Sequence, residues 1–280
     1  MNGNNKKRSK LKSLGLALLW VLIFYAAMQL VSIVSSAVVF AAGRPDGYLN
    51  VYATLELLQQ LLGDYSVWIT FATDTVIIAA ILIYFALRRN SPRRALRIGY
   101  TTPRTLALCA VLGISANVFS VFVISLMPWP ESIVNGLNDN YSGIASEGSL
   151  FMSLLVFAVM TAIVEEIFFR VLVISELGQS FGRTGCIIIS ALLFGAVHWN
   201  PIAIFYASAL GVILSTVYFR YGSVWPGVFI HMFFNIAGIL SFDMPPAIYL
   251  AAVFISTAAV MLTTYLLLGR GTSRETAVKL

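Results

Sequence analysis

Two glutamates and an arginine interrupt an apolar run in the middle of the chain, Val164-Glu165-Glu166-Ile167-Phe168-Phe169-Arg170. Glu166 and Arg170 are four residues apart with the acid first, the favourable order for an ion pair along a helix. Glu165 is rotated by about 100° around the same helix, so it has no partner there. We therefore expect Glu166 to pair with Arg170 and Glu165 to remain available as a general base or acid. The alternative is one buried ion-pair cluster that only fixes helix packing.

The histidines point to the same kind of chemistry. The chain has two, and both lie in apolar segments. His198 follows Phe194 by four residues and His231 precedes Asn235 by four, so each pair shares one helix face. A single histidine on an apolar face is usually a satisfied core residue. Because none occurs elsewhere in this chain, we interpret both as functional.

The composition indicates which elements must position these residues. Of the 280 residues, 59% are hydrophobic and 11% are charged, whereas soluble domains carry about 25% charged residues. Lipid must therefore solvate much of the surface. Apolar windows of about 20 residues predict an all-α, polytopic membrane protein with about eight transmembrane helices. These helices are expected at 14–42, 66–87, 105–127, 150–174, 186–199, 202–219, 223–241 and 247–268.

We expect a single membrane domain over residues 1–280. Its first part, 1–149, holds the first three helices and their loops. The second part, 150–241, is the motif-bearing catalytic core, and 247–268 forms the last helix. Cys109 and Cys186 both fall in apolar runs without a neighbouring cysteine, so we expect neither a disulfide framework nor a thiolate metal site.

The distribution of basic residues predicts the orientation in the membrane. With eight helices and a cytoplasmic N-terminus, sixteen of the eighteen lysines and arginines lie on the cytoplasmic side, as the positive-inside rule requires. The exceptions are Arg44 and Arg170. Both termini are then cytoplasmic. The net charge of +6 is therefore a topology signal rather than a sign of nucleic-acid binding, and the lipid bilayer is its expected partner.

The expected helices also place the candidate residues at comparable depths. At 1.5 Å per residue, Glu165 lies roughly 13 Å, His231 roughly 12 Å and His198 roughly 18 Å from the cytoplasmic helix ends. We therefore expect the three side chains to meet in one cavity in the inner half of the bilayer, opening toward the cytoplasm. Asp74 lies in the second helix without an obvious partner, and structural and functional roles are equally open for it.

Taken together, the motifs resemble those of a known family. Glu165-Glu166-x-x-x-Arg170, Phe194-x-x-x-His198 and His231-x-x-x-Asn235 are similar to the three motifs of the CPBP family of intramembrane proteases. This family, also called Abi, includes CAAX proteases and bacteriocin-processing proteins, and its eukaryotic relatives are the CAAX prenyl endopeptidases. The resemblance covers roughly residues 150–240, and the eight-helix arrangement with a cytoplasmic N-terminus is similar as well.

The resemblance implies a multi-pass endopeptidase of the cell membrane and a role for each motif residue. Glu165 would activate a water molecule, and His198 would help to hold or deprotonate it. His231 and Asn235 would stabilise the oxyanion of the tetrahedral intermediate, with Glu166 and Arg170 as supporting residues.

The resemblance leaves the cofactor open between two mechanisms. Glu165, His198 and His231 together would form a familiar zinc ligand set, but the chain has no His-Glu-x-x-His motif. We expect a glutamate-activated water and no metal, with zinc as the alternative.

Two other function classes remain as alternatives to a peptidase that acts on a peptide or protein substrate. Bacterial members of the family are linked to self-immunity against bacteriocins, so the chain could be a non-catalytic immunity or scaffold protein. Intramembrane Glu, His and Asp residues also build proton relays, which would suit a proton-coupled transporter. The sequence contains no matched pair of broken helices that would favour a transporter.

Overall fold

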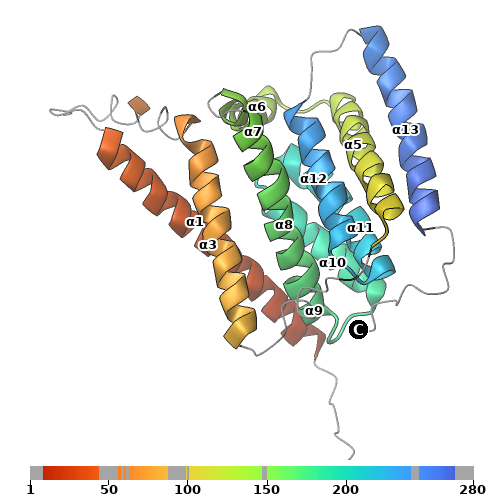
Figure 1. Cartoon of the computed structure of the whole chain (residues 1–280), viewed down its shortest axis with the longest axis horizontal. Coiled ribbons are helices and arrows are strands. Elements are labelled where there is room, and N and C mark those ends of the chain that lie inside the picture. Colours follow the sequence, from red (N-terminus) through yellow and green to blue (C-terminus); the bar gives the residue numbers. More distant parts are fainter. Residues whose placement is uncertain are drawn as a thin grey trace, which may run out of the picture.

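The computed structural model describes residues 9–43, 56–57, 60, 63–87, 99, 101–146, 150–240 and 246–268, and all of its regular elements are helices. Figure 1 shows them as one bundle. The all-α, polytopic membrane architecture predicted from composition is confirmed. The helices are α1 (Lys10–Gly43), α3 (Ser66–Leu87), α5 (Pro103–Ser125), α6 (Glu131–Ser146), α7 (Leu150–Ser153), α8 (Thr161–Glu166), α9 (Ile174–Leu177), α10 (Arg183–Ala196), α11 (Pro201–Tyr221), α12 (Trp225–Ile239) and α13 (Pro246–Leu268).

Elements α7 to α9 form one continuous helix over residues 150–177. Two π-helical stretches, η1 (Leu154–Met160) and η2 (Ile167–Val173), lie on either side of α8. The backbone at the junctions keeps right-handed helical angles, so the helix continues through them. Single π-helical turns are rare in α-helices and are frequent at functional sites.

All eight predicted helices are present, but they differ in length. Six helices among the described residues are long and apolar enough to span a membrane. The other two, α10 and α12, have 14 and 15 residues. At 1.5 Å per residue they are only about 21–23 Å long, less than the roughly 30 Å of the hydrocarbon core. The structure adds α6, an extra helix between the third and fourth predicted ones.

The predicted helix 186–199 was wrong at its C-terminal end. Helix α10 stops at Ala196, and His198 lies in the turn that follows. Trp199 has a positive φ of 59°, so the chain leaves the right-handed helical path there, where φ is near −60°. The Asn200 side chain then accepts hydrogen bonds from the Ile202 and Ala203 amides and starts α11. Pro201, at the first position of α11, has no backbone N–H and therefore leaves no donor there to be capped.

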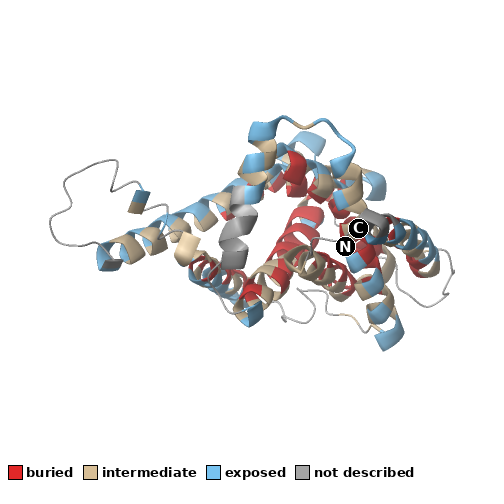
Figure 2. Ribbon diagram, turned by 90° about the horizontal axis from the view of Figure 1, so that it is seen from above, coloured by how far each residue is buried: buried red, intermediate tan, exposed pale blue. Residues whose placement is uncertain are grey.

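The motif-bearing helices form the most buried part of the bundle (Figure 2), whereas the C-terminal part of α1 projects away from it (Figure 1). Close packing depends on glycine at two interfaces. A Cβ at Gly113 of α5 would overlap the Ile230 carbonyl of α12, and a Cβ at Gly211 of α11 would lie 2.9 Å from the Ala191 backbone of α10. Small residues allow helix backbones to approach this closely within membranes. Large exposed apolar side chains on α1, α3 and α13 are suited to contact with lipid.

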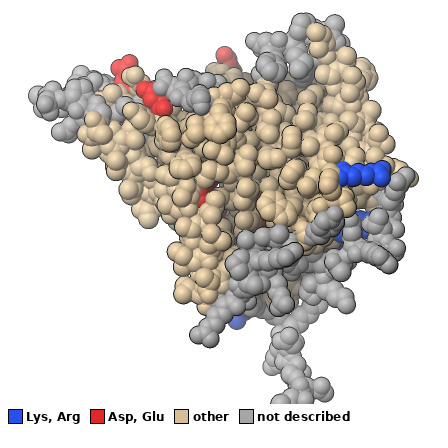
Figure 3. Space-filling model, viewed as in Figure 1, with Lys and Arg blue, Asp and Glu red and all other residues tan. Residues whose placement is uncertain are grey.

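Charged side chains separate toward the two ends of the bundle (Figure 3). Helix ends at one side carry the described basic residues Lys10, Lys12, Arg104, Arg183 and Arg220, together with Glu176. Glu56, Asp64 and Glu131 lie at the opposite side. The arginines at 88–97 and the basic residues at 270–279 fall outside the described residues. That the basic end is cytoplasmic therefore stays a prediction.

Candidate active site

The Glu166–Arg170 ion pair predicted from spacing is present and fully buried. The Arg170 Nε lies 3.0 Å from Glu166 Oε2, and a second guanidinium nitrogen donates to Glu166 Oε1 at 3.2 Å. Both side chains are 0% exposed. The remaining guanidinium nitrogen donates to the hydroxyls of Ser190 and Ser215. A bidentate ion pair of this kind fixes the orientation of the two side chains as well as their charge. Both oxygens of the Glu166 carboxylate therefore bind Arg170.

Glu165 has a different environment although it is the next residue. It lines a cavity and is 9% exposed, and among the described residues it forms no ion pair with an arginine or lysine. Nε2 of His231 lies 3.7 Å from its carboxylate. The prediction that the two glutamates play different parts agrees with this geometry.

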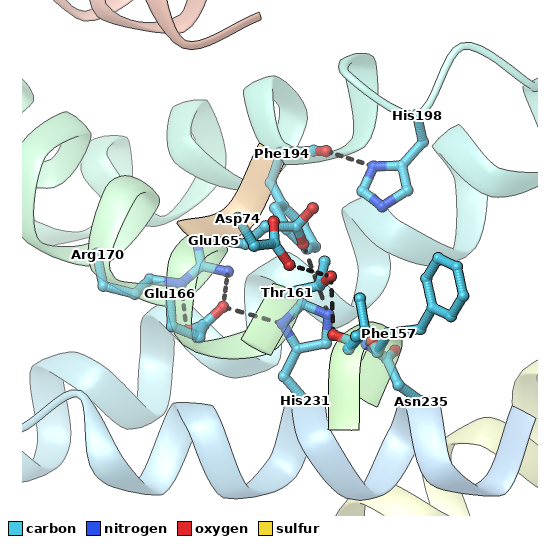
Figure 4. Close-up of polar contacts among 11 residues, drawn as sticks. Asp74, Phe157, Thr161, Glu165, Glu166, Arg170, Phe194, His198, His231 and Asn235 are labelled. Carbon is cyan, nitrogen blue, oxygen red and sulfur yellow. Dashed lines mark hydrogen bonds and ion pairs between the residues drawn. The ribbon is translucent and has the colours of Figure 1, made fainter. Parts of the chain in front are cut away.

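His231 lies between the two carboxylates. Its Nδ1 is 3.5 Å from Glu166 Oε1, and its Nε2 is 3.7 Å from Glu165 Oε2 (Figure 4). The helix α12 can bring it this close because Gly227, one turn earlier, faces Glu166. A Cβ at that position would lie 2.7 Å from Glu166 Oε2. His231 therefore connects the buried ion pair to the carboxylate that lines the cavity.

His198 is held by the backbone of its own hairpin. Its Nδ1 lies 2.9 Å from the Phe194 carbonyl oxygen. A carbonyl oxygen only accepts, so Nδ1 must carry the hydrogen, and the neutral ring keeps its lone pair on Nε2. Phe194 also contacts the rings of both histidines edge-on. The turn at 197–200 thus presents Nε2 of His198 as a hydrogen-bond acceptor at the cavity.

Asn235 lies one turn after His231 on the same face of α12, as its spacing predicted. Its Nδ2 donates to the Phe157 carbonyl at 3.1 Å. That carbonyl lies in η1, where the π-helical stretch departs from α-helical hydrogen bonding. A primary amide has two N–H donors, so the other one can serve a ligand in the cavity.

The predicted polar residues surround one cavity of about 160 Å³. Glu165, His198, His231 and Asn235 all line it, so helices distant in the sequence converge as the depth estimate predicted. At roughly 30 Å³ per water molecule, it has room for about five waters. The remaining lining residues are mostly apolar: Asn117, Phe157, Thr161, Phe194, Tyr206, Ala207, Leu210, Phe234, Gly238 and Ile239.

Asp74 has a partner that its sequence position did not indicate. The Thr161 hydroxyl donates to Asp74 Oδ2 at 2.9 Å, which links α3 to α8. Thr161 also lines the cavity, one turn before Glu165. The spacing of Thr161 and Glu165 is a signal that could have identified this threonine. Its contact with Asp74 joins residues 87 positions apart, which no local pattern reveals.

The zinc ligand set of the alternative mechanism stays a prediction. Within the described part of the chain, no group of three His, Cys, Asp or Glu side chains is arranged to hold a metal ion. The Nδ1 of His198 donates to a carbonyl, which leaves Nε2 free and is also how metal-binding histidines are commonly held. His231 lies between the two glutamates. Glu165, His198 and His231 share a cavity wall but do not form a ligand cluster.

Comparison with known proteins supports the resemblance. Residues 147–237 match the family described as type II CAAX prenyl endopeptidase Rce1-like. A Bacillus subtilis protein named "Putative membrane peptidase YdiL" is 23% identical over 218 residues, covering 77% of this chain and 85% of the relative. No solved structure matches the chain. The matched segment contains all three motifs, so the predicted resemblance to the CPBP and Rce1-like proteins is confirmed.

Proposed function

We propose that this chain, whose motif-bearing helices are of the Rce1-like type, is an intramembrane endopeptidase that uses a glutamate-activated water. The comparisons support a membrane protease at the level of the family. The observation that carries the mechanism is the contrast between the two glutamates. Glu166 is neutralised by Arg170, whereas Glu165 lines a cavity with room for a few waters, which His198 lines as well.

In the proposed reaction, a water molecule is held between the Glu165 carboxylate and Nε2 of His198. Glu165 accepts a proton as the water oxygen attacks the carbonyl carbon of the scissile peptide bond. The tetrahedral intermediate then collapses with cleavage of the C–N bond, and Glu165 returns the proton to the departing amine nitrogen. The products are a new carboxylate and a new amino terminus, and no redox partner is needed.

The remaining motif residues support this step. The free N–H of Asn235 is suited to stabilise the oxyanion, the usual task of a fixed amide donor in acyl transfer. We assign His231 to the same task, and its position 3.7 Å from Glu165 also suits it to orient that carboxylate. Arg170 holds the Glu166 carboxylate in place, which fixes the opposite side of the His231 ring.

The test is carried out in the host membrane because the substrate is not known. A strain lacking the chain is complemented with the parent, Glu165→Gln, His198→Ala or Glu56→Gln, and new amino termini in the membrane fraction are sequenced by mass spectrometry. Glu56 is an exposed glutamate away from the cavity, so its variant is the matched control. Fragments with ends in or beside apolar segments are expected from the parent and the control.

Fragments found equally in all four strains would contradict the proposal. A phenotype of the deletion strain that Glu165→Gln restores fully would favour the non-catalytic immunity or scaffold role instead. Metal analysis of the purified protein tests the cofactor separately. We expect no stoichiometric zinc and no loss of cleavage with a chelator.

A further inference from the structure

A second, larger cavity adjoins the candidate active site. Its volume is about 610 Å³, within the roughly 300–1,000 Å³ of typical ligand pockets. Five residues line both cavities, so the two adjoin: Asn117, Tyr206, Phe234, Gly238 and Ile239. A molecule in the larger cavity therefore lies next to the cavity that Glu165 and His198 line.

The larger cavity lies toward one end of the bundle. Its lining comes from the C-terminal half of α5 and its following turn, from α6, from the start of α11 and from the end of α12. These segments are remote from the basic helix ends at Arg104, Arg183 and Arg220. The cavity therefore extends toward the end that carries Glu131, not toward the basic end.

Packed side chains fill the space between the candidate active site and the basic end of the bundle. Arg170 occupies the space one turn beyond Glu166, and the next layers toward the basic end are fully buried: Leu177, Leu214, Tyr218 and Phe219. The larger cavity therefore lies away from the basic end, where the sequence predicted the opening toward the cytoplasm.

The lining chemistry restricts what can occupy the larger cavity. Among the described residues that line it, none is Lys, Arg, Asp or Glu. Its polar groups are neutral amides and hydroxyls, from Asn117, Ser120, Ser125 and Asn138, set among apolar side chains such as Ile124 and Leu137. Such a surface suits an extended apolar peptide, whose backbone hydrogen-bonds to the neutral groups. It offers no cation for a free carboxylate at a chain terminus.

We propose that substrate reaches Glu165 from the non-cytoplasmic side, as an uncharged apolar peptide segment that lies in the cavity between α5, α6, α11 and α12. The substrate is then an internal segment of a chain located at the outer side of the membrane rather than a cytoplasmic C-terminal tail. The proposal rests on the proposed function for its chemistry, and its geometry is tested without any cleavage.

Cysteine labelling in cells tests the direction of access. Ser120→Cys reports whether the reagent reaches the wall of the larger cavity, and Thr184→Cys reports whether it reaches the exposed start of α10 at the basic end. Both native cysteines are 0% exposed, so the unmodified chain provides the blank. Intact cells are treated with a membrane-impermeant maleimide and compared with permeabilised cells. We expect Ser120→Cys to react to the same extent in both samples and Thr184→Cys to react only after permeabilisation.

The converse pattern, with Ser120→Cys reactive only after permeabilisation, would overturn the proposed direction. The substrate class is tested by protection of Ser120→Cys in a Glu165→Gln background, using an apolar hexapeptide with both ends blocked and the same peptide with a free C-terminal carboxylate. Protection by the blocked peptide alone is expected. Stronger protection by the peptide with the free C-terminal carboxylate would refute the proposed substrate class. Because neither readout requires catalysis, a failure of the proteolytic function would be seen separately.

Discussion

Removal of Arg170 should destabilise the protein strongly, whereas removal of both members of its ion pair should not. Arg170→Met leaves the Glu166 carboxylate fully buried without its charge partner, and the hydroxyls of Ser190 and Ser215 lose their donor. Breaking a buried pair from one side costs about 3–5 kcal/mol. We therefore expect the free energy of unfolding to fall by about this amount.

The double variant Glu166→Gln/Arg170→Met removes the uncompensated charge. Replacement of a whole buried pair is often neutral, so it should recover most of the stability lost in the single variant. Cleavage should not recover to the same extent, because the ion pair also fixes the carboxylate 3.5 Å from Nδ1 of His231. If stability recovers in the double variant but cleavage does not, the ion pair is shown to position His231.

The assay is equilibrium unfolding of the purified protein in mixed micelles, with denaturing detergent as the variable. Arg104→Met, an exposed arginine at the start of α5, is the matched control and should change stability by less than about 0.5 kcal/mol. If Arg170→Met is no less stable than this control, or if the double variant is as unstable as the single one, the assignment of Glu166 to Arg170 is refuted.

Three further substitutions test the packing around the site. Gly113→Ala forces a Cβ into the backbone of α12 and should cost about 1–3 kcal/mol, measured by the same unfolding assay, whereas Gly15→Ala, with open space around it, should be neutral. Asn200→Ala removes the cap of α11 and should cost about 1 kcal/mol and reduce cleavage, since the cap fixes the turn that holds His198. Asn200→Asp keeps the capping oxygen but loses the bond that Asn200 donates to the Ile133 carbonyl, so it should recover part of the loss, and equal loss in the two variants would contradict a role for the cap. Thr161→Val leaves Asp74 buried without its donor and should cost about 1–3 kcal/mol, while Thr161→Ser should behave as the parent; a stable valine variant would show that the contact is unimportant.

The helices and the Glu166–Arg170 pair could be predicted from the sequence because both depend on local geometry. An apolar run long enough to cross the bilayer must satisfy its backbone internally and therefore forms a helix. Two residues four positions apart on that helix face the same side whatever surrounds them. The resemblance carried by the three motifs is also a property of the sequence, and the comparisons bear it out.

The end of α10 could not be read from hydropathy, because the apolar pattern continues through Val197 and Trp199 although the helix does not. The positive φ of Trp199 and the cap by Asn200 end it. His198 is therefore presented by a turn, which directs its Nδ1 to the Phe194 carbonyl and leaves Nε2 for the cavity.

Contacts between helices were decided by tertiary packing alone. The position of His231 between two carboxylates and the bond from Thr161 to Asp74 join residues that are distant in the chain. They depend on how closely the helices approach, which glycines such as Gly113 and Gly227 permit.

The sequence by itself determined that polar side chains lie inside the membrane and which of them share a helix face. Only the tertiary structure decided that they meet at one cavity, and that a larger cavity adjoins it on the side away from the basic helix ends. Depth along a helix follows from counting residues. The direction of an opening depends on where side chains from several helices leave space, and packed layers such as Arg170, Tyr218 and Phe219 close the other side.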